Sequence, residues 1–255
     1  MITQRKILMT KLRKVAFLAL LGLASHAFAF DHFTAKSWLV ADKNGKVMDG
    51  NNTSEVRSIA SITKLMTVMV VLDAQQDLNE IISTKLFKSK LSRRDLISLA
   101  IVKSNNDAAR ILCEKYPTGL SGCITAMNTK AQALNMNNTR YVDPTGLMSD
   151  NVSTAEDLVK LVLAASKYPI INEDSNKDTI KFRPNKKKVV EFHNTNKLVG
   201  QGFDFIVSKT GWIHRSGGCI VMMIATAVDD RIVVLLGSKS TKTRIPEAKM
   251  IALAY

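Results

Sequence analysis

The run from Ile62 to Leu72 constrains the fold most, because apolar side chains would occupy almost every side of the helix that it forms. Such a helix offers no polar face to solvent, so it must lie inside the protein under other elements. Ser61 and Lys64 stand at its start, three residues apart, and would share a face of the first turn. The sequence therefore predicts a buried helix that brings a hydroxyl and an ammonium group together.

Burial would make Ser61 and Lys64 reactive. Removing an ammonium group from water is costly, so burial lowers the pKa of a lysine toward the range in which its neutral form accepts a proton. A serine hydroxyl becomes an effective nucleophile when a neighbouring base takes its proton. A helix N-terminus also stabilises developing negative charge. The pair indicates acyl transfer, and the same spacing also fits an N-cap serine followed by a lysine that reaches water.

The first 29 residues have the parts of a secretion signal: a basic start, an apolar run from Val15 to Ala24, and a small-x-small pattern that ends at Ala29. The apolar run is too short to span a membrane. We expect cleavage after Ala29, which leaves residues 30–255 as one exported domain. An uncleaved N-terminal anchor is the alternative.

The chain is basic, with a formal net charge of +14 over 255 residues. An exported basic protein favours anionic polymers or surfaces, such as cell wall or membrane headgroups. Peripheral contact with such a surface is left open, and the lysine-rich run 181–188 is either its candidate segment or a solvated hairpin. We expect no nucleic acid partner, because no basic motif is interleaved with aromatic residues.

Three cysteines in an oxidising compartment cannot all pair within one chain. Cys113 and Cys123 flank a turn and are candidates for a disulfide, whereas Cys219 lies in an apolar run typical of a buried thiol. The bridge stays one of two alternatives, because the sequence does not give the Cα separation that it requires.

Strand patterns lie at both ends of the chain and helical patterns in the middle. A ribbon of two strands is predicted on either side of the Asn44-Gly45 turn. Helices are predicted over 96–102, 108–116, 124–134, 153–166 and 245–255, and later strands over 180–182, 189–192, 205–210, 219–228 and 231–236. This order predicts an α+β fold in which the ribbon joins a C-terminal antiparallel sheet, with a helical lobe inserted at 79–163.

Local signals mark where some of these helices begin. Ser92 with Asp95, and Ser153 with Glu156, match the capping-box spacing. Pro117, Gly119 and Gly122 are expected to separate two helices.

Two further motifs accompany Ser61 and Lys64. Ser104-Asn105-Asn106 falls at a break between helices, and Lys209-Thr210-Gly211 at the end of a strand. Taken alone, the first motif fits an ordinary capping loop, and the second fits an edge strand that runs into a turn. In this order and separation, the three motifs together are the signature of the penicilloyl serine transferases.

The chain resembles the low-molecular-mass penicillin-binding proteins, and among them the D-alanyl-D-alanine endopeptidases of the penicillin-binding protein seven type. The likeness runs from about residue 37 to about 238 and includes residues 61–67, 127–139, 143–147 and 153–155. The resemblance implies a β-lactamase/transpeptidase-like fold, with about five antiparallel strands flanked by helices and an inserted helical lobe. It also implies a periplasmic location, a peptidoglycan peptide substrate and β-lactam inhibitors.

The resemblance also implies catalytic roles. Ser61 attacks a D-alanyl carbonyl and becomes the acyl-enzyme, and neutral Lys64 takes its proton. Ser104 relays a proton to the leaving amine, because a hydroxyl both donates and accepts.

The remaining implied roles concern substrate binding. Asn106 would bond the substrate peptide and orient Lys64, and Lys209 would place positive charge beside Ser104. Thr210 contacts the carboxylate side of the substrate, and Gly211 lets its backbone approach closely. The N–H groups of Ser61 and Trp212 form the oxyanion hole. No metal or cofactor is expected, because the histidines at 32, 193 and 214 lack ligand spacing.

Rival activities share this fold. A class A β-lactamase needs a Glu-x-x-Leu-Asn pattern, which is absent between 143 and 176, so penicillins should inhibit rather than be consumed. Carboxypeptidases usually continue into a β-rich domain and an anchoring helix, for which a chain ending at Tyr255 leaves no room. We therefore expect an endopeptidase that remodels the wall, with carboxypeptidase action and a non-catalytic wall-binding protein as alternatives.

Overall fold

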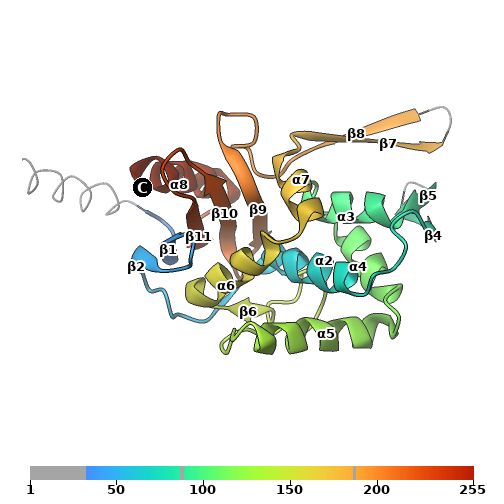
Figure 1. Ribbon diagram of the computed structural model, residues 1–255, viewed down its shortest axis with the longest axis horizontal. Coiled ribbons are helices and arrows are strands. Elements are labelled where there is room, and N and C mark those ends of the chain that lie inside the picture. The colour runs from blue at the N-terminus through green and yellow to red at the C-terminus, as the bar shows by residue number, and fades with distance from the viewer. Residues whose placement is uncertain (1–32, 87–88, 186–187) are drawn as a thin grey trace, which may run out of the picture. The chain divides into compact units, whose positions relative to one another are not determined.

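The computed structural model describes residues 33–86, 89–185 and 188–255 (Figure 1). The predicted signal segment and its cleavage site lie outside the described residues, as does the tip of the lysine-rich hairpin at 186–187. No helix of the described part combines the length and apolarity needed to cross a bilayer. The domain boundaries, with the lobe at 79–163, stay a prediction.

A five-stranded antiparallel sheet joins the two ends of the chain. Its strand order is β2-β1-β11-β10-β9, and its members are β1 (Ser37–Asp42), β2 (Val47–Asn51), β9 (Asp204–Ile213), β10 (Gly217–Ala225) and β11 (Arg231–Ser238). Strand β1 pairs with β11 along its whole length, so the predicted N-terminal ribbon does join the C-terminal strands. The α+β prediction is confirmed.

Both faces of this sheet are covered. Along β11, Ile232, Val234 and Leu236 belong to the main apolar core, and the alternate residues Val233 and Leu235 are buried as well. Alternation in a strand sends successive side chains to opposite faces, so each face needs its own cover. Helix α6 (Ala155–Ala165) packs on β11 and β1, and α8 (Thr241–Ala254) bonds β11 through Ser238 and Glu247.

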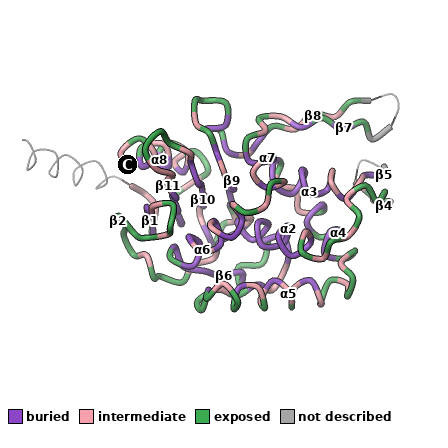
Figure 2. Tube along the Cα trace, viewed as in Figure 1, coloured by how far each residue is buried: buried purple, intermediate pink, exposed green. Residues whose placement is uncertain are grey.

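Helix α2 (Thr63–Asp73) is the buried helix that the sequence predicts. Every residue from Thr63 to Val71 is buried (Figure 2). The helix contacts α3 (Arg93–Ile101), α4 (Asn106–Glu114), α5 (Gly119–Ala133) and α6, which explains its lack of a polar face. Ser61 lies in the preceding 3-10 turn, η1 (Ala60–Ile62), two residues before the α-helix begins.

The capping predictions have different outcomes. Ser92 and Asp95 form the predicted reciprocal box at the start of α3. The box from Ser153 to Glu156 is wrong, because α6 is capped one residue later by Thr154, which accepts from the N–H of Asp157 at 3.1 Å. Glu156 instead accepts a hydrogen bond from Thr53.

Helix α5 begins at Gly119, so Gly119 and Gly122 lie inside a helix rather than between two. Cys113 and Cys123 form the disulfide that the sequence left open, and it joins α4 to α5. Cys219 is the buried free thiol among the described residues.

The remaining elements are short. Helix α7 (Pro169–Asn176) was not predicted, and it packs against β9. The short strands form three pairs: β3 (Arg57–Ser58) with β6 (Val152–Ser153), β4 (Ile81–Thr84) with β5 (Ser89–Ser92), and β7 (Thr179–Asn185) with β8 (Lys188–His193).

Candidate active site

Lys64 is the centre of the site. Its side chain is fully buried, and Nζ donates to Ser61 Oγ at 2.7 Å, to Asn106 Oδ1 at 2.8 Å and to the carbonyl oxygen of Thr145 at 2.6 Å. All three partners are formally neutral, so no carboxylate in direct contact balances the ammonium charge. Burial lowers the pKa of Lys64 to about 7, and the more distant Asp143 raises it only in part.

These three contacts fix where the lone pair of a neutral Lys64 points. An ammonium has three N–H donors, and a neutral amine has two donors and one lone pair. The Asn106 Oδ1 and Thr145 carbonyl oxygens only accept, so each holds one N–H. The lone pair then faces Ser61 Oγ, the one partner that can donate a proton.

The loop from Asp143 to Gly146 holds the Thr145 carbonyl in place. Asp143 Oδ1 accepts from the N–H groups of Thr145 at 2.5 Å and Gly146 at 2.9 Å. Thr67, one helical turn after Lys64, donates to the carbonyl of Pro144 at 2.7 Å. The sequence marked this loop as a turn and gave it no function, because its contact with Lys64 spans 81 residues.

Two glycines pack against the backbone of Ser61. A Cβ on Gly146 would lie 1.9 Å from the carbonyl oxygen of Ala60, and a Cβ on Gly211 would lie 2.9 Å from the nitrogen of Ser61. Ala60 itself has a φ of 47°, which is uncommon for a residue with a side chain. The absence of a Cβ at these two glycines lets the nucleophile turn pack closely against the loop that ends at Gly146 and against β9 at Gly211.

Strand β9 brings the third motif, Lys209-Thr210-Gly211, to the site. Lys209 is buried, its Nζ donates to the Thr210 carbonyl at 2.9 Å, and Thr210 Oγ1 bonds Thr195 Oγ1 at 2.7 Å. Burial lowers the pKa of Lys209 well below its ordinary value, and the nearby charges of Lys64 and Arg244 lower it further. Trp212 is half exposed at the edge of the site.

Ser104 stands two residues before α4, next to its N-cap Asn105, with a left-handed backbone, φ 59°. Within the described residues, its hydroxyl makes no hydrogen bond to Ser61, Lys64 or Lys209, so the structure joins Asn106 but not Ser104 to the lysine network. Arg244 on α8 is a further member of the site that the sequence did not indicate. It is buried and donates to the Gly211 carbonyl at 2.7 Å, and nothing in its local pattern marks it.

A family model described as D-alanyl-D-alanine carboxypeptidase, peptidase family S11, matches residues 24–86 and 76–240. The chain belongs to peptidase family S11. Among its curated relatives, the D-alanyl-D-alanine endopeptidase of Pseudomonas aeruginosa is 42% identical over 205 residues, which cover 73% of this chain and 66% of the relative. The Escherichia coli D-alanyl-D-alanine endopeptidase is 40% identical over 217 residues, 78% of this chain and 69% of the relative. The chain thus spans about two thirds of the length of these relatives.

Solved structures share the fold. Penicillin-Binding Protein D2 from Listeria monocytogenes, in its cefotaxime-bound form, matches with a TM-score of 0.78 and 27% identity over 88% of this chain and 97% of that one. The Streptomyces K15 DD-transpeptidase matches with a TM-score of 0.80 and 23% identity over 88% and 97%. The predicted transpeptidase-like fold is therefore confirmed. No group of three or more His, Cys, Asp or Glu side chains in the described part is arranged to hold a metal ion.

Proposed function

We propose that this S11 peptidase is an exported D-alanyl-D-alanine endopeptidase, which hydrolyses D-alanyl cross-links of peptidoglycan through an acyl-enzyme on Ser61. One observation carries the proposal: a buried lysine with a pKa of about 7 contacts a serine hydroxyl at 2.7 Å. This is the arrangement that activates a serine for attack on a carbonyl. The names and 40–42% identities of the two relatives support the choice of an endopeptidase.

In the proposed reaction, neutral Lys64 takes the proton of Ser61 as Oγ attacks the D-alanyl carbonyl carbon. The tetrahedral intermediate collapses, the C–N bond breaks, and the leaving amine receives a proton through Ser104. Water then attacks the ester with Lys64 again as the base, which releases the D-alanyl carboxylate and restores Ser61. Positioned acid–base groups of this kind typically contribute about 10²- to 10⁴-fold in rate.

The other predicted residues bind the substrate in this proposal. Asn106 keeps its oxygen on Lys64, and its amide N–H groups meet the substrate peptide. Lys209 and Thr210 face the carboxylate side of the scissile bond, and Gly211 admits the substrate backbone beside β9. The N–H groups of Ser61 and Trp212 stabilise the oxyanion, worth about 2.7–4 kcal/mol each.

β-Lactams would acylate Ser61 by the same attack and leave slowly. The cefotaxime-bound relative of the same fold supports this. Peripheral contact of the basic surface with anionic wall or membrane remains part of the proposal, and raised salt should release such contact from isolated sacculi.

The proposal is tested with a mixture of cross-linked muropeptide dimer and monomeric pentapeptide, followed by mass spectrometry with and without prior penicillin. We expect penicillin-sensitive conversion of dimer to monomers, with pentapeptide largely spared. Release of D-alanine from pentapeptide with the dimer untouched would instead establish a carboxypeptidase, the activity that the family model names. If neither substrate is consumed and penicillin does not label the protein, both the endopeptidase and the carboxypeptidase activity are contradicted.

A further inference from the structure

A second concavity, which none of the predicted site residues lines, lies beside the nucleophile turn. It has a volume of about 660 Å³, within the range of small-ligand sites. Its lining includes Glu55, Arg57, Ser58, Asp150, Val152 and Arg215. Two carboxylates and two guanidinium groups therefore share one pocket, so its net charge is zero although its wall is highly polar.

The four charges are not equivalent. Arg57 donates to Glu55 at 2.5 Å, and this contact pairs one charge of each sign inside the pocket. Asp150 and Arg215 are exposed, and neither makes an ion pair with any described residue. The pocket thus offers one open guanidinium fork and one open carboxylate. The Nε of Arg57 is buried and has no hydrogen-bond partner among the described atoms.

The pocket is built from the segments that position Ser61. Ser58 lies three residues before the nucleophile, and the strand that contains it pairs with β6, next to Asp150. The N–H of Ile59 donates to the Asn151 carbonyl at 3.1 Å, which ties the two walls together. The third wall is the turn between β9 and β10, where Arg215 follows Trp212 by three residues.

The direction of β9 places this pocket on one side of the scissile bond. In the proposed function, Thr210 faces the carboxylate side and the Trp212 N–H marks the carbonyl that reacts. Moving along the strand from Thr210 past Trp212 therefore leads from the leaving-group side to the acyl-donor side. Arg215 lies further in that direction, so the pocket faces the residue that precedes the scissile D-alanine.

We propose that this pocket is a subsite for a zwitterionic side-chain end, an ammonium and a carboxylate on one carbon, carried by the residue before the D-alanyl group of the acyl donor. Arg215 binds the carboxylate as a planar fork, and Asp150 binds the ammonium. A ligand with only one charge would leave the other pocket charge without a partner. The inference rests on the proposed function and specifies the class of donor peptide.

The test uses three donor peptides with one common D-amino-acid leaving group after D-alanine. The preceding residue is diaminopimelyl, with both charges on its side-chain end, lysyl, with the ammonium alone, or norleucyl, with neither. Wild-type protein and the variants Arg215→Gln, Asp150→Asn and Lys167→Gln are compared by kcat/KM on each peptide. Lys167 is exposed and lies outside the pocket lining, so its variant controls for the loss of one positive charge.

We expect wild type and Lys167→Gln to prefer the diaminopimelyl over the lysyl peptide by about tenfold. Arg215→Gln should remove that preference, and Asp150→Asn should remove the smaller preference for lysyl over norleucyl. Fluorescent penicillin labelling of Ser61 is measured in parallel and reports on the proposed function alone. The subsite is overturned if labelling is normal and the rates are equal on all three peptides, or if Arg215→Gln retains the preference for the diaminopimelyl peptide. If labelling is absent, the proposed function is overturned, and the subsite with it.

Discussion

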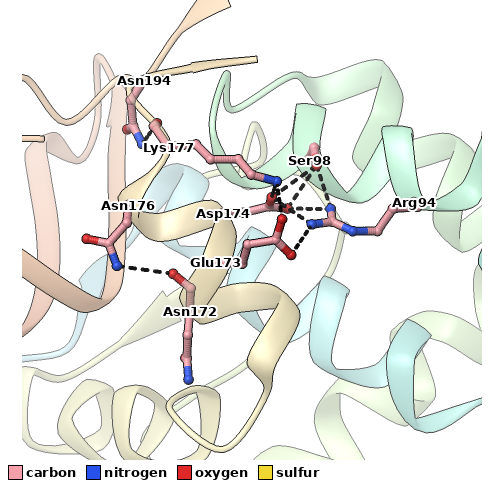
Figure 3. A network of polar contacts seen from close by, with 8 residues as sticks. All are labelled: Arg94, Ser98, Asn172, Glu173, Asp174, Asn176, Lys177 and Asn194. Atoms are coloured by element: carbon pink, nitrogen blue, oxygen red, sulfur yellow. Dashed lines mark hydrogen bonds and ion pairs between the residues drawn. The ribbon is translucent and has the colours of Figure 1, made fainter. Parts of the chain in front are cut away.

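Two fully buried charged side chains, Lys64 and Asp174, are compensated in opposite ways. Lys64 has three neutral partners. Asp174 is held by two cations, Arg94 at 2.7 Å and Lys177 at 2.9 Å, and by the hydroxyl of Ser98 (Figure 3). Burial lowers the pKa of Lys177, but hydrogen bonds to Glu173 and Asp174 raise it by more, so this pKa is raised overall. At Lys64, the effect of burial exceeds the opposing effect of Asp143, so its pKa falls.

This difference in partners distinguishes a buried charge that stabilises the fold from a buried charge that can react. Arg94 and Ser98 belong to α3, and Asp174 belongs to α7, so the cation–carboxylate network joins the two helices. The next residue, Ser175, accepts from the N–H of Ser208 on β9 at 2.9 Å, so α7 also holds the strand that carries Lys209. A paired charge fixes elements in place, whereas an ammonium with only neutral partners is ready to lose its proton.

The largest effect is expected from Lys64→Met. The change removes the base and leaves a side chain of similar length in an apolar helix, so penicillin acylation of Ser61 should fall about 10²- to 10⁴-fold with the fold retained. Stopped-flow acylation and circular dichroism check both parts. Lys130→Met on α5 is the control, because that lysine pairs with Asp73 and lies outside the Lys64 network, so it should acylate like wild type. Equal rates for Lys64→Met and wild type would exclude Lys64 as the base.

Next in size is Asp174→Asn, which leaves Arg94 and Lys177 without their shared carboxylate. Removing one partner of a buried ion pair costs about 3–5 kcal/mol in the free energy of unfolding, and the partial exposure of the two cations, 23% for Arg94 and 32% for Lys177, favours the lower end. Urea unfolding measures it. Glu173→Gln is the matched control, since Glu173 contacts the same two cations but is 57% exposed and should cost less than about 1 kcal/mol. A similar loss in both variants would show that burial does not distinguish the two carboxylates.

The sequence predicts the features that depend on neighbours in the chain. Periodicity gives the strands of the sheet and the buried helix α2, and the spacing of Ser61 and Lys64 gives their contact, because three residues make almost one turn. Helix α7 was missed because Asn172 to Asn176 are all polar, and its place depends on Asp174 reaching α3.

The site was predicted only in part, because some of its contacts join residues that lie far apart in the sequence. The contacts of Lys64 with Thr145 and of Gly211 with Arg244 cross 81 and 33 residues, so no local pattern indicates them. The capping error at Ser153 has another cause: Ser153 and Thr154 are both good N-caps, and only the packed structure chooses between them.

A pH profile of acylation tests whether Lys64 loses its proton near pH 7. With a pKa of about 7, Lys64 is protonated in more acidic solution and cannot accept the proton of Ser61. The acylation rate should therefore fall about tenfold per pH unit below 7 and level off above it. Penicillin acylation between pH 5 and 9 measures this, with folding followed by fluorescence at each pH. A rate still rising tenfold per unit above pH 8 would contradict a neutral Lys64 at pH 7.

The smallest effect is expected from Lys177→Met. Asp174 keeps Arg94 and Ser98 as partners, so the free energy of unfolding should fall by about 1 kcal/mol or less. Urea unfolding checks this, and acylation by penicillin should stay at the wild-type rate. A loss as large as that of Asp174→Asn would mean that Lys177, rather than Arg94, carries the compensation.

The pKa of Lys64 itself can be measured directly. Protein labelled with ¹³C at the lysine ε-carbons is titrated by NMR, and the Lys64 signal is assigned as the one absent from Lys64→Met. We predict a titration near pH 7, well apart from those of the exposed lysines. A Lys64 signal that titrates above pH 10 would contradict the account, because the ammonium would then be charged whenever substrate arrives.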